Sequence, residues 1–263
     1  MITKAVLFDL DDTLLWDERS VQEAFEATCK EATTFYPSIT PYQLEVAVRA
    51  EARTLYETYE TFSFTKIIGI NPFEALWAHF SQGDNENFRK LERLAPTYRL
   101  ESWTRGLKAL GIDDPKLGHQ LADQFPRERR QRPYVYEETF AVLDKLKGYV
   151  KLLLLTNGSP DLQKEKLAGV PRLAPYFDHI IISGDFGVGK PDPTIFNHAM
   201  ELLNIRPEEG IMVGDKLTTD ILGSNRVGML NAWVNRHEMK RSDEIVPKHE
   251  IQNLHELLNL IQS

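Results

Sequence analysis

The 263-residue chain has a single cysteine, no long apolar run and no excess of basic residues, and each shortage excludes a class of protein. Cys29 alone can form no internal disulfide bond, and no basic segment followed by an apolar one opens the chain. The densest apolar run, Val150 to Leu155, is far shorter than the ~20 residues of a membrane-spanning helix. A formal net charge of -8 and a pI near 5.5 argue against a nucleic-acid surface, which needs clustered Lys and Arg. We therefore expect a cytoplasmic protein with no membrane and no nucleic-acid partner.

Several common catalytic and metal motifs are also missing. The seven histidines lack the spacing of a zinc site, and the chain has neither a Gly-x-Ser-x-Gly elbow nor an internal repeat. Hydrophobic residues make up 42% of the chain, which is enough for the packed core of one large domain or two smaller ones. The chain is therefore not a disordered protein.

The start of the chain combines a short apolar run with acidic residues. Residues 4–10 read as a buried strand that contains Asp9, and Asp11 and Asp12 follow at once. In an open parallel sheet, ligands bind outside the carboxyl ends of the strands. Side chains alternate with a period of two, so Asp9 and Asp11 project the same way if the strand continues. An acidic turn or a helix cap explains this stretch equally well, and other positions must decide.

The periodicity of the apolar residues changes near residue 134. Residues 17–132 show helical periodicity with no convincing strand, and prolines divide them into about five helices. These prolines are Pro37, Pro41, Pro72, Pro96 and Pro115. Beyond them, short apolar runs alternate with amphipathic helical segments, and the runs cover residues 151–156, 179–183, 211–213 and 230–234.

Alternating strands and helices predict an α/β fold, a Rossmann-like parallel sheet core covered by helices. The strand at residues 4–10 has no partner nearby and joins this sheet most economically. We therefore expect a core domain of residues 1–16 and 133–263 and an inserted α-helical cap domain of residues 17–132. Such an insertion, leaving after the first strand, lies above the ligand-binding edge.

Each later strand is followed by a polar group. The run at 151–155 leads to Thr156, Asn157 and Gly158, where a glycine lets backbone N–H groups approach an anion. The run at 179–183 precedes a loop with Lys190 as its only cation, and the run at 211–213 precedes Asp215 and Asp220. Taken singly, these are an ordinary turn, an exposed loop lysine and a helix cap.

Taken together, the polar groups at one sheet edge suit a metal and a phosphoryl group. Clustered carboxylates repel one another, and a bound hard cation offsets this repulsion. Mg²⁺ is a suitable cation for Asp9, Asp11 and Asp215. A phosphoryl group that bridges the metal and Lys190 then satisfies the remaining charges, with Thr156 as a further donor.

This pattern resembles the haloacid dehalogenase superfamily, whose four motifs are Asp-x-Asp-x-Thr, a strand-terminal Thr or Ser, a Lys, and Gly-Asp-x(3 or 4)-Asp. Their order agrees across the whole chain, and a helical cap after the first motif is the subfamily I arrangement. The matching segments are Asp9-Leu-Asp11-Asp-Thr13, Thr156-Asn-Gly158, Lys190-Pro-Asp-Pro193, and Gly214-Asp215 with Asp220.

The resemblance implies a Mg²⁺-dependent phosphomonoester hydrolase that works through an aspartyl phosphate. Asp9 would be the nucleophile, and Asp11 would protonate the leaving oxygen and then activate water. The metal ligands would be the Asp9 carboxylate, the Asp11 main-chain carbonyl and Asp215. Thr156, Asn157 and Lys190 would hold the phosphoryl oxygens. Asp220 would orient Lys190 or a metal-bound water, and Asp12 would be a loop or surface residue.

Other activities stay open at this point. Dehalogenases resemble this fold but lack an acid at the position of Asp11, which favours a phosphatase; phosphomutases often carry Gly at the position of Asp12. The segment from Gly184 to Lys190 matches a P-loop NTPase up to its last residue, but Pro191 offers no hydroxyl for Mg²⁺. A non-catalytic phosphoacceptor module uses a similar residue set but has no large cap.

The substrate is less defined than the reaction. A small phosphorylated metabolite is expected, with phosphoserine favoured and sugar, acylneuraminate and nucleoside phosphates as alternatives. Lys216 stands where relatives often carry a small polar residue, and its role is open. The arginines of Arg127 to Arg132 could steer an anion or partner a helix dipole, and the dipole role is favoured. A capped site within one chain requires no second subunit.

Overall fold

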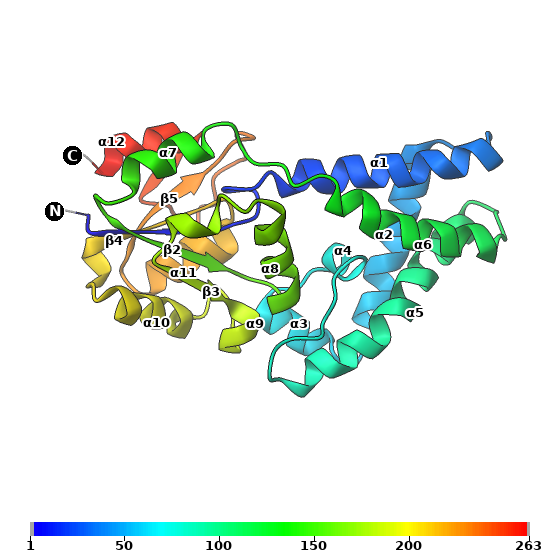
Figure 1. The fold of residues 1–263 in the computed structure, drawn as a ribbon, viewed down its shortest axis with the longest axis horizontal. Helices are drawn as coiled ribbons and strands as arrows, with labels where there is room; N and C mark the ends of the chain where they lie inside the picture. Colours follow the sequence, from blue (N-terminus) through cyan, green and yellow to red (C-terminus); the bar gives the residue numbers. More distant parts are fainter. Residues whose placement is uncertain (1–2, 262–263) are drawn as a thin grey trace. The chain divides into compact units, whose positions relative to one another are not determined.

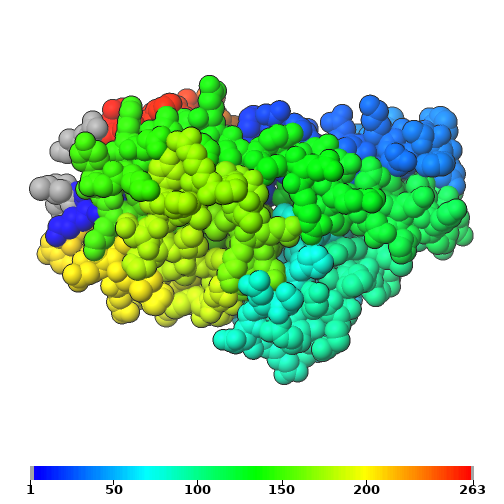
Figure 2. All heavy atoms as spheres, in the orientation of Figure 1, coloured from blue at the N-terminus to red at the C-terminus, as the bar shows by residue number. Residues whose placement is uncertain are grey.

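The computed structural model describes residues 3–261, and residue contacts divide the chain into two compact units. The sheet unit comprises the residues up to Trp16, Val135–Gly158 and the residues from Val170 onward. The helical unit comprises Asp17–Tyr134 and Ser159–Gly169. Figure 1 draws both as ribbons, and Figure 2 shows in the same view how side chains fill the space between the ribbons of each unit. Within residues 3–261, no helix combines the length and the apolar character that crossing a membrane demands.

The sheet unit is built on six parallel strands in the order β3-β2-β1-β4-β5-β6, with helices along the sheet. This architecture confirms the predicted α/β, Rossmann-like fold. The strands are β1 (Ala5–Phe8), β2 (Lys151–Thr156), β3 (His179–Ile182), β4 (Gly210–Gly214), β5 (Leu230–Val234) and β6 (His249–Ile251). β6 was not expected from the sequence, because three residues with one apolar side chain show no periodicity.

The register brings distant residues to one edge of the sheet. Phe8 pairs with Leu154 of β2 on one side and with Val213 of β4 on the other. The Asp9 N–H extends this ladder by donating to the Val213 carbonyl at 2.9 Å. The residues that follow these strands therefore meet at the carboxyl ends of the three central strands.

Apolar burial holds the sheet in place. All four residues of β1 are buried, as expected for a central parallel strand covered on both faces. In Figure 1, α7 and α12 lie on one face of the sheet and α10 lies on the other. The helical segments of this unit are α7 (Thr139–Leu146), α9 (Ser183–Phe186), α10 (Pro193–Leu203), α11 (Leu222–Arg226) and α12 (Leu257–Ile261), with short turns at Ala174–Tyr176, Pro207–Glu209, Leu217–Ile221 and Leu254–Glu256.

The helical unit contains α1 (Asp17–Phe35), α2 (Pro41–Glu57), α3 (Phe62–Ile68), α4 (Pro72–Ala75), α5 (Glu86–Ala109), α6 (Pro115–Arg130) and α8 (Pro160–Gly169). Thr40 caps α2 with a capping box completed by Gln43. The predicted break at Pro96 is wrong, because α5 continues through this residue. Its neighbours Ala95 and Tyr98 are both buried, and this packing keeps the helix intact.

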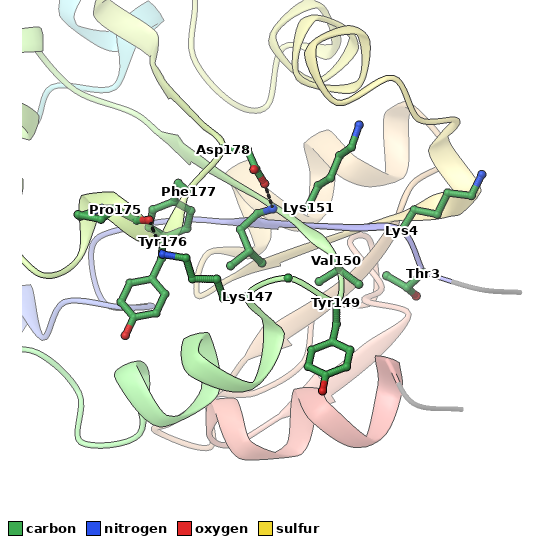
Figure 3. Close-up of a pocket in the computed structure, with 12 residues that line it drawn as sticks. Thr3, Lys4, Lys147, Tyr149, Val150, Lys151, Pro175, Tyr176, Phe177 and Asp178 are labelled. Atoms are coloured by element: carbon green, nitrogen blue, oxygen red, sulfur yellow. Dashed lines mark hydrogen bonds between the residues drawn. The ribbon is translucent and has the colours of Figure 1, made fainter.

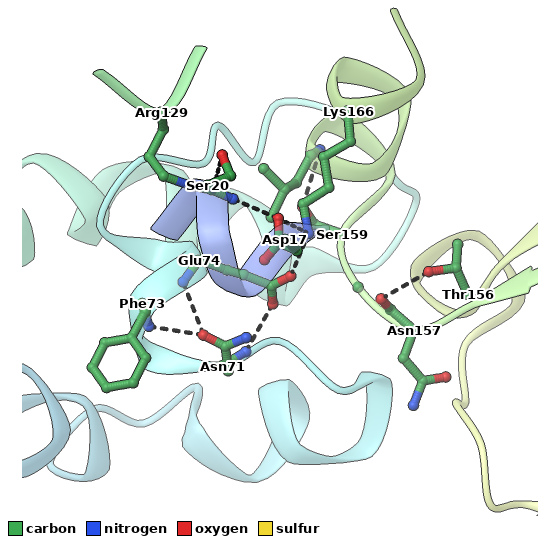
Figure 4. A network of polar contacts seen from close by, with 12 residues as sticks. Asp17, Ser20, Asn71, Phe73, Glu74, Arg129, Thr156, Asn157, Ser159 and Lys166 are labelled. Carbon is green, nitrogen blue, oxygen red and sulfur yellow. Dashed lines mark hydrogen bonds and ion pairs between the residues drawn. The ribbon is translucent and has the colours of Figure 1, made fainter. Parts of the chain in front are cut away.

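Helix α8 groups with the helical unit, although it directly follows β2 in the chain. Leu162 is fully buried in the apolar core of that unit. Lys166 places its ammonium 3.0 Å from a carboxylate oxygen of Glu74, and Figure 4 shows this network. These units therefore differ from the expected domains at residues 133–134 and 159–169, and the functional domain boundaries stay a prediction.

Candidate active site

A buried lysine joins two carboxylates at the carboxyl edge of the sheet. The Lys190 Nζ lies 2.6 Å from Asp9 Oδ1 and 2.7 Å from Asp220 Oδ1. It also donates to the Leu155 carbonyl at 2.7 Å. Asp9, Lys190 and Asp220 expose 7%, 4% and 0% of their surface, so water screens these charges little. The sheet therefore brings together three of the predicted site residues.

The charges of this cluster do not balance. Burial raises the pKa of Asp9, and the Asp220 carboxylate adds to this effect against the attraction of Lys190. Burial also raises the pKa of Asp215 well above its usual range, and repulsion from Asp9 adds to it. Burial lowers the pKa of Lys190, but Asp220 and Asp9 outweigh it and leave this pKa raised. The cluster holds more negative charge than Lys190 can neutralise.

The donor set fits a hard divalent cation. Carboxylate oxygens of Asp9, Asp215 and Asp220 lie within 4.8 Å of one another. Asp215 Oδ1 is buried, and no group of the described chain donates a hydrogen bond to it. Oxygen ligands at a carboxylate cluster are typical of Mg²⁺. Asp220 is already engaged, since its Oδ1 pairs with Lys190 and its Oδ2 accepts the Lys216 N–H at 3.0 Å.

The loop that carries Asp11 is held through its backbone. Leu14 and Leu15 both donate N–H groups to the Leu10 carbonyl, at 3.0 and 2.9 Å. Asp12 has φ of 59°, a left-handed conformation that Asp tolerates, and its N–H donates to the Leu15 carbonyl at 2.7 Å. This tight turn places Asp11 directly beyond Asp9 while Asp12 turns the chain.

Two residues that were not predicted from the sequence hold the Asp11 loop in place by hydrogen bonds to its main chain. The Thr139 hydroxyl donates to the Leu14 carbonyl at 2.9 Å, and Arg236 donates to the Thr13 carbonyl at 3.2 Å. Arg236 also lies over the Tyr136 ring at 3.6 Å. The available signal was the place of Arg236 just after a strand, at the same sheet edge as Asp9.

Thr156 is the last residue of β2, and Asn157 follows it. Thr156 is buried, and its hydroxyl donates to the Asn157 carbonyl at 3.4 Å, as Figure 4 shows. The Asn157 side chain binds the main chain of Lys190, at 2.8 and 2.9 Å. The Gly158 N–H donates to the Ser183 hydroxyl at 2.9 Å. Asn157 was expected to hold a phosphoryl oxygen, and both polar atoms of its side chain have a partner in the main chain of Lys190.

The sequence left the role of Lys216 open, and the structure places this residue near the carboxylates. Desolvation lowers the pKa of Lys216, but attraction to Asp215, Asp9 and Asp11 outweighs it and raises this pKa above its usual value. Lys216 is exposed to solvent, and the attraction of these carboxylates keeps it positively charged.

The arginine cluster lies at the carboxyl end of α6, in the helical unit. Arg129 pairs with Asp17 at 2.6 Å, Arg130 with Glu165 at 2.5 Å, and Arg132 with Glu128 at 2.5 Å. These ion pairs give three of the arginines partners inside the unit, which supports a structural role for them.

A cavity of about 640 Å³ lies in the sheet unit at the amino-terminal end of β2 (Figure 3). Lysines line it, but their ammonium groups are engaged by the chain. Lys147 donates to the Pro175 carbonyl at 2.8 Å and Lys151 donates to the Leu203 carbonyl at 2.6 Å. Thr156 and Asp9 lie at the carboxyl ends of β2 and β1, at the opposite edge of the sheet. This cavity is therefore separate from the candidate site.

Comparisons with known proteins agree with this geometry. A family model for haloacid dehalogenase-like hydrolases matches residues 3–228. The chain is 35% identical over 255 residues to a phosphoserine phosphatase of Thermus thermophilus, a match that covers 97% of each protein. It is 28% identical over 269 residues to a glyceraldehyde 3-phosphate phosphatase of Methanopyrus kandleri, with 98% of this chain and 97% of that protein covered.

Solved structures show the same fold. The hydrolase YfnB of Bacillus subtilis, solved with bound magnesium, superposes with a TM-score of 0.67 at 22% identity, over all of both chains. A phosphatase of Thermococcus onnurineus gives a TM-score of 0.59 at 25% identity, over 98% of each chain. The chain thus belongs to the haloacid dehalogenase-like hydrolases, and it is an enzyme of their phosphatase branch.

Proposed function

We propose that this protein is a Mg²⁺-dependent phosphomonoesterase that hydrolyses a small phosphorylated metabolite through a phosphorylated Asp9. One observation carries the proposal: Lys190 joins Asp9 and Asp220 beside a carboxylate set that fits a divalent cation. A nucleophilic carboxylate that approaches phosphate needs such cations. Two like unit charges about 4 Å apart repel by roughly 4 kcal/mol at an effective dielectric of about 20.

The proposed reaction has two steps. In the first, an Asp9 carboxylate oxygen forms a bond to phosphorus while the bond to the leaving oxygen breaks, and Asp11 gives that oxygen a proton. In the second, water attacks phosphorus, Asp11 takes the proton, and the Asp9 carboxylate leaves. Lys190 neutralises phosphoryl charge in both steps. Mg²⁺, held by Asp9, the Asp11 carbonyl and Asp215, would supply further charge neutralisation.

Phosphoserine is the first substrate to test. The relative named a phosphoserine phosphatase is 35% identical over nearly the full length of both chains. Glyceraldehyde 3-phosphate is the second, from a more distant full-length relative at 28% identity. Both are small phosphate monoesters with an ionisable or polar leaving group.

A hydrolysis screen tests this proposal. Phosphoserine, glyceraldehyde 3-phosphate, sugar and nucleoside monophosphates, p-nitrophenyl phosphate and a 2-haloacid are compared by kcat/KM with Mg²⁺ and with a chelator. We expect Mg²⁺-dependent phosphate release, highest with phosphoserine, and no release by Asp9→Asn. Halide release, phosphate transfer without hydrolysis, or full activity of Asp9→Asn would contradict the proposal.

A further inference from the structure

The side chain of Asn157 and the main chain of Lys190 form a closed pair of hydrogen bonds. Asn157 Oδ1 accepts the Lys190 N–H at 2.8 Å, and Asn157 Nδ2 donates to the Lys190 carbonyl at 2.9 Å. The two residues are 33 positions apart, so the pair joins the end of β2 to the loop that follows β3. Both polar atoms of the Asn157 amide are used in this way.

Gly189 makes this approach possible. A Cβ at position 189 would lie 2.7 Å from Asn157 Oδ1 and 2.9 Å from both Cγ and Nδ2. Carbon atoms do not approach that closely, so any other residue at position 189 would displace the Asn157 side chain. The need for glycine here is therefore steric and depends on Asn157.

Residues 155–157 hold both the main chain and the side-chain ammonium group of Lys190. Asn157 fixes its main chain, and the Leu155 carbonyl accepts a hydrogen bond from its Nζ at 2.7 Å. A lysine side chain is flexible, with about 2 kcal/mol of rotamer entropy. If its main chain were also unfixed, the ammonium group would occupy many positions. With both ends tied to β2, the ammonium stays within 2.6 Å of Asp9 Oδ1.

We propose that Asn157 is a positioning residue, and that its side chain and Gly189 form a clamp that holds Lys190 against Asp9. Asn157 then acts through Lys190, and its side chain does not bind the phosphoryl group. This inference rests on the proposed function for its kinetic consequence, but the clamp itself can be measured without turnover.

Kinetics of three variants test the clamp. Asn157→Ala removes both hydrogen bonds, and we expect kcat with Mg²⁺ and p-nitrophenyl phosphate to fall between about 10- and 100-fold with little change in KM. Gly189→Ala pushes the same side chain away and should give a similar loss. In the double variant the new methyl group has no Asn157 side chain to displace, so its kcat should equal that of Asn157→Ala. Multiplied losses in the double variant would overturn the clamp.

A second outcome of Asn157→Ala would also overturn the clamp: an unchanged kcat with a higher KM for substrate and weaker inhibition by inorganic phosphate. That result would show that the Asn157 side chain binds the phosphoryl group. Asn197→Ala is the matched control, because Asn197 is exposed on α10 and takes no part in the hydrogen bonds between Asn157 and Lys190. It should leave kcat and KM unchanged.

Hydrogen exchange at the Lys190 amide separates the clamp from the proposed function. Its N–H is bonded to Asn157 Oδ1, so we expect at least about tenfold faster exchange in Asn157→Ala and Gly189→Ala, and no change in Asn197→Ala. Faster exchange in a protein without phosphatase activity would support the clamp and reject the proposed function. Unchanged exchange in both clamp variants would reject the clamp whatever the activity.

Discussion

Asp9 and Asp11 are two residues apart, but the structure gives them different surroundings. Asp9 directly follows the buried strand β1 and is ion-paired to Lys190. Asp11 lies in a turn held by backbone hydrogen bonds and by Arg236. A fixed, paired carboxylate suits a nucleophile, whereas a side chain beyond the strand suits proton transfer.

The Asp11→Asn variant tests proton transfer to the leaving group. Loss of a general acid typically lowers the rate by about 10²- to 10⁴-fold. We expect a loss of this size with phosphoserine and a clearly smaller loss of the first step with p-nitrophenyl phosphate, because nitrophenolate leaves without a proton. Burst kinetics with both esters measures this difference. Equal losses would contradict the acid role of Asp11.

The Asp215→Asn variant tests the metal site. Asp215 Oδ1 is buried with no hydrogen-bond donor in the described chain, so it is available to a cation. We expect the Mg²⁺ concentration for half-maximal activity to rise at least about tenfold. Asp243→Asn, at an exposed position of the sheet unit, is the control. An unchanged Mg²⁺ requirement in Asp215→Asn would exclude this residue as a ligand.

At the scale of elements, α8 is fastened to the helical unit by buried charge. Lys166 lies 3.0 Å from Glu74 and 3.8 Å from Asp17, and the Lys166 and Glu74 side chains are at most 8% exposed. Breaking a buried pair leaves one charge uncompensated, which typically costs about 3–5 kcal/mol. We expect Lys166→Met to lower the free energy of unfolding by about this amount, measured by denaturant titration.

The double variant Lys166→Met with Glu74→Leu completes this test. Replacing both charges by apolar groups of similar size is often nearly neutral. We therefore expect the double variant to recover most of the stability that Lys166→Met loses. Additive losses would show that the two side chains contribute independently.

A second element-scale contact joins the start of β1 to the turn before β4. Hydrogen bonds from Lys4 and from the Arg206 main chain lower the pKa of Glu209 to about 2. A lowered folded-state pKa stabilises the protein above the unfolded value of about 4.3, and this contribution is lost as the pH falls through about 2. We expect Glu209→Gln to be less stable than wild type at pH 7, and the difference to vanish between about pH 4 and pH 2. A difference that persists at pH 2 would contradict this account.

The elements of the sheet differ in how clearly the sequence predicts them, and the differences have physical reasons. Central parallel strands are buried on both faces and form continuous apolar runs, so β1, β2 and β4 were recognisable. Within residues 3–261, β6 pairs only with β5, and its residues 249–251 carry no such run. The break expected at Pro96 failed because packing of α5 outweighed local propensity.

At the scale of the whole molecule, the fold brings together residues that are far apart in sequence. Asp9 and Lys190 are 181 positions apart, and the parallel register carries both to one edge. Motifs at strand ends made this meeting predictable. The clamp of Asn157 on Lys190 was not predictable, because it depends on how two loops approach each other after β2 and β3.

The central claim is that Asp9 becomes phosphorylated during turnover. Protein mixed with Mg²⁺ and substrate is quenched in acid during the first turnover and reduced with borohydride, which converts phosphoaspartate to homoserine. Peptide mass spectrometry then locates the modified residue. We predict homoserine at position 9, and none in Asp9→Asn or in protein mixed with chelator. Modification of another residue, or an unmodified Asp9 during a measured burst of leaving group, would contradict the account.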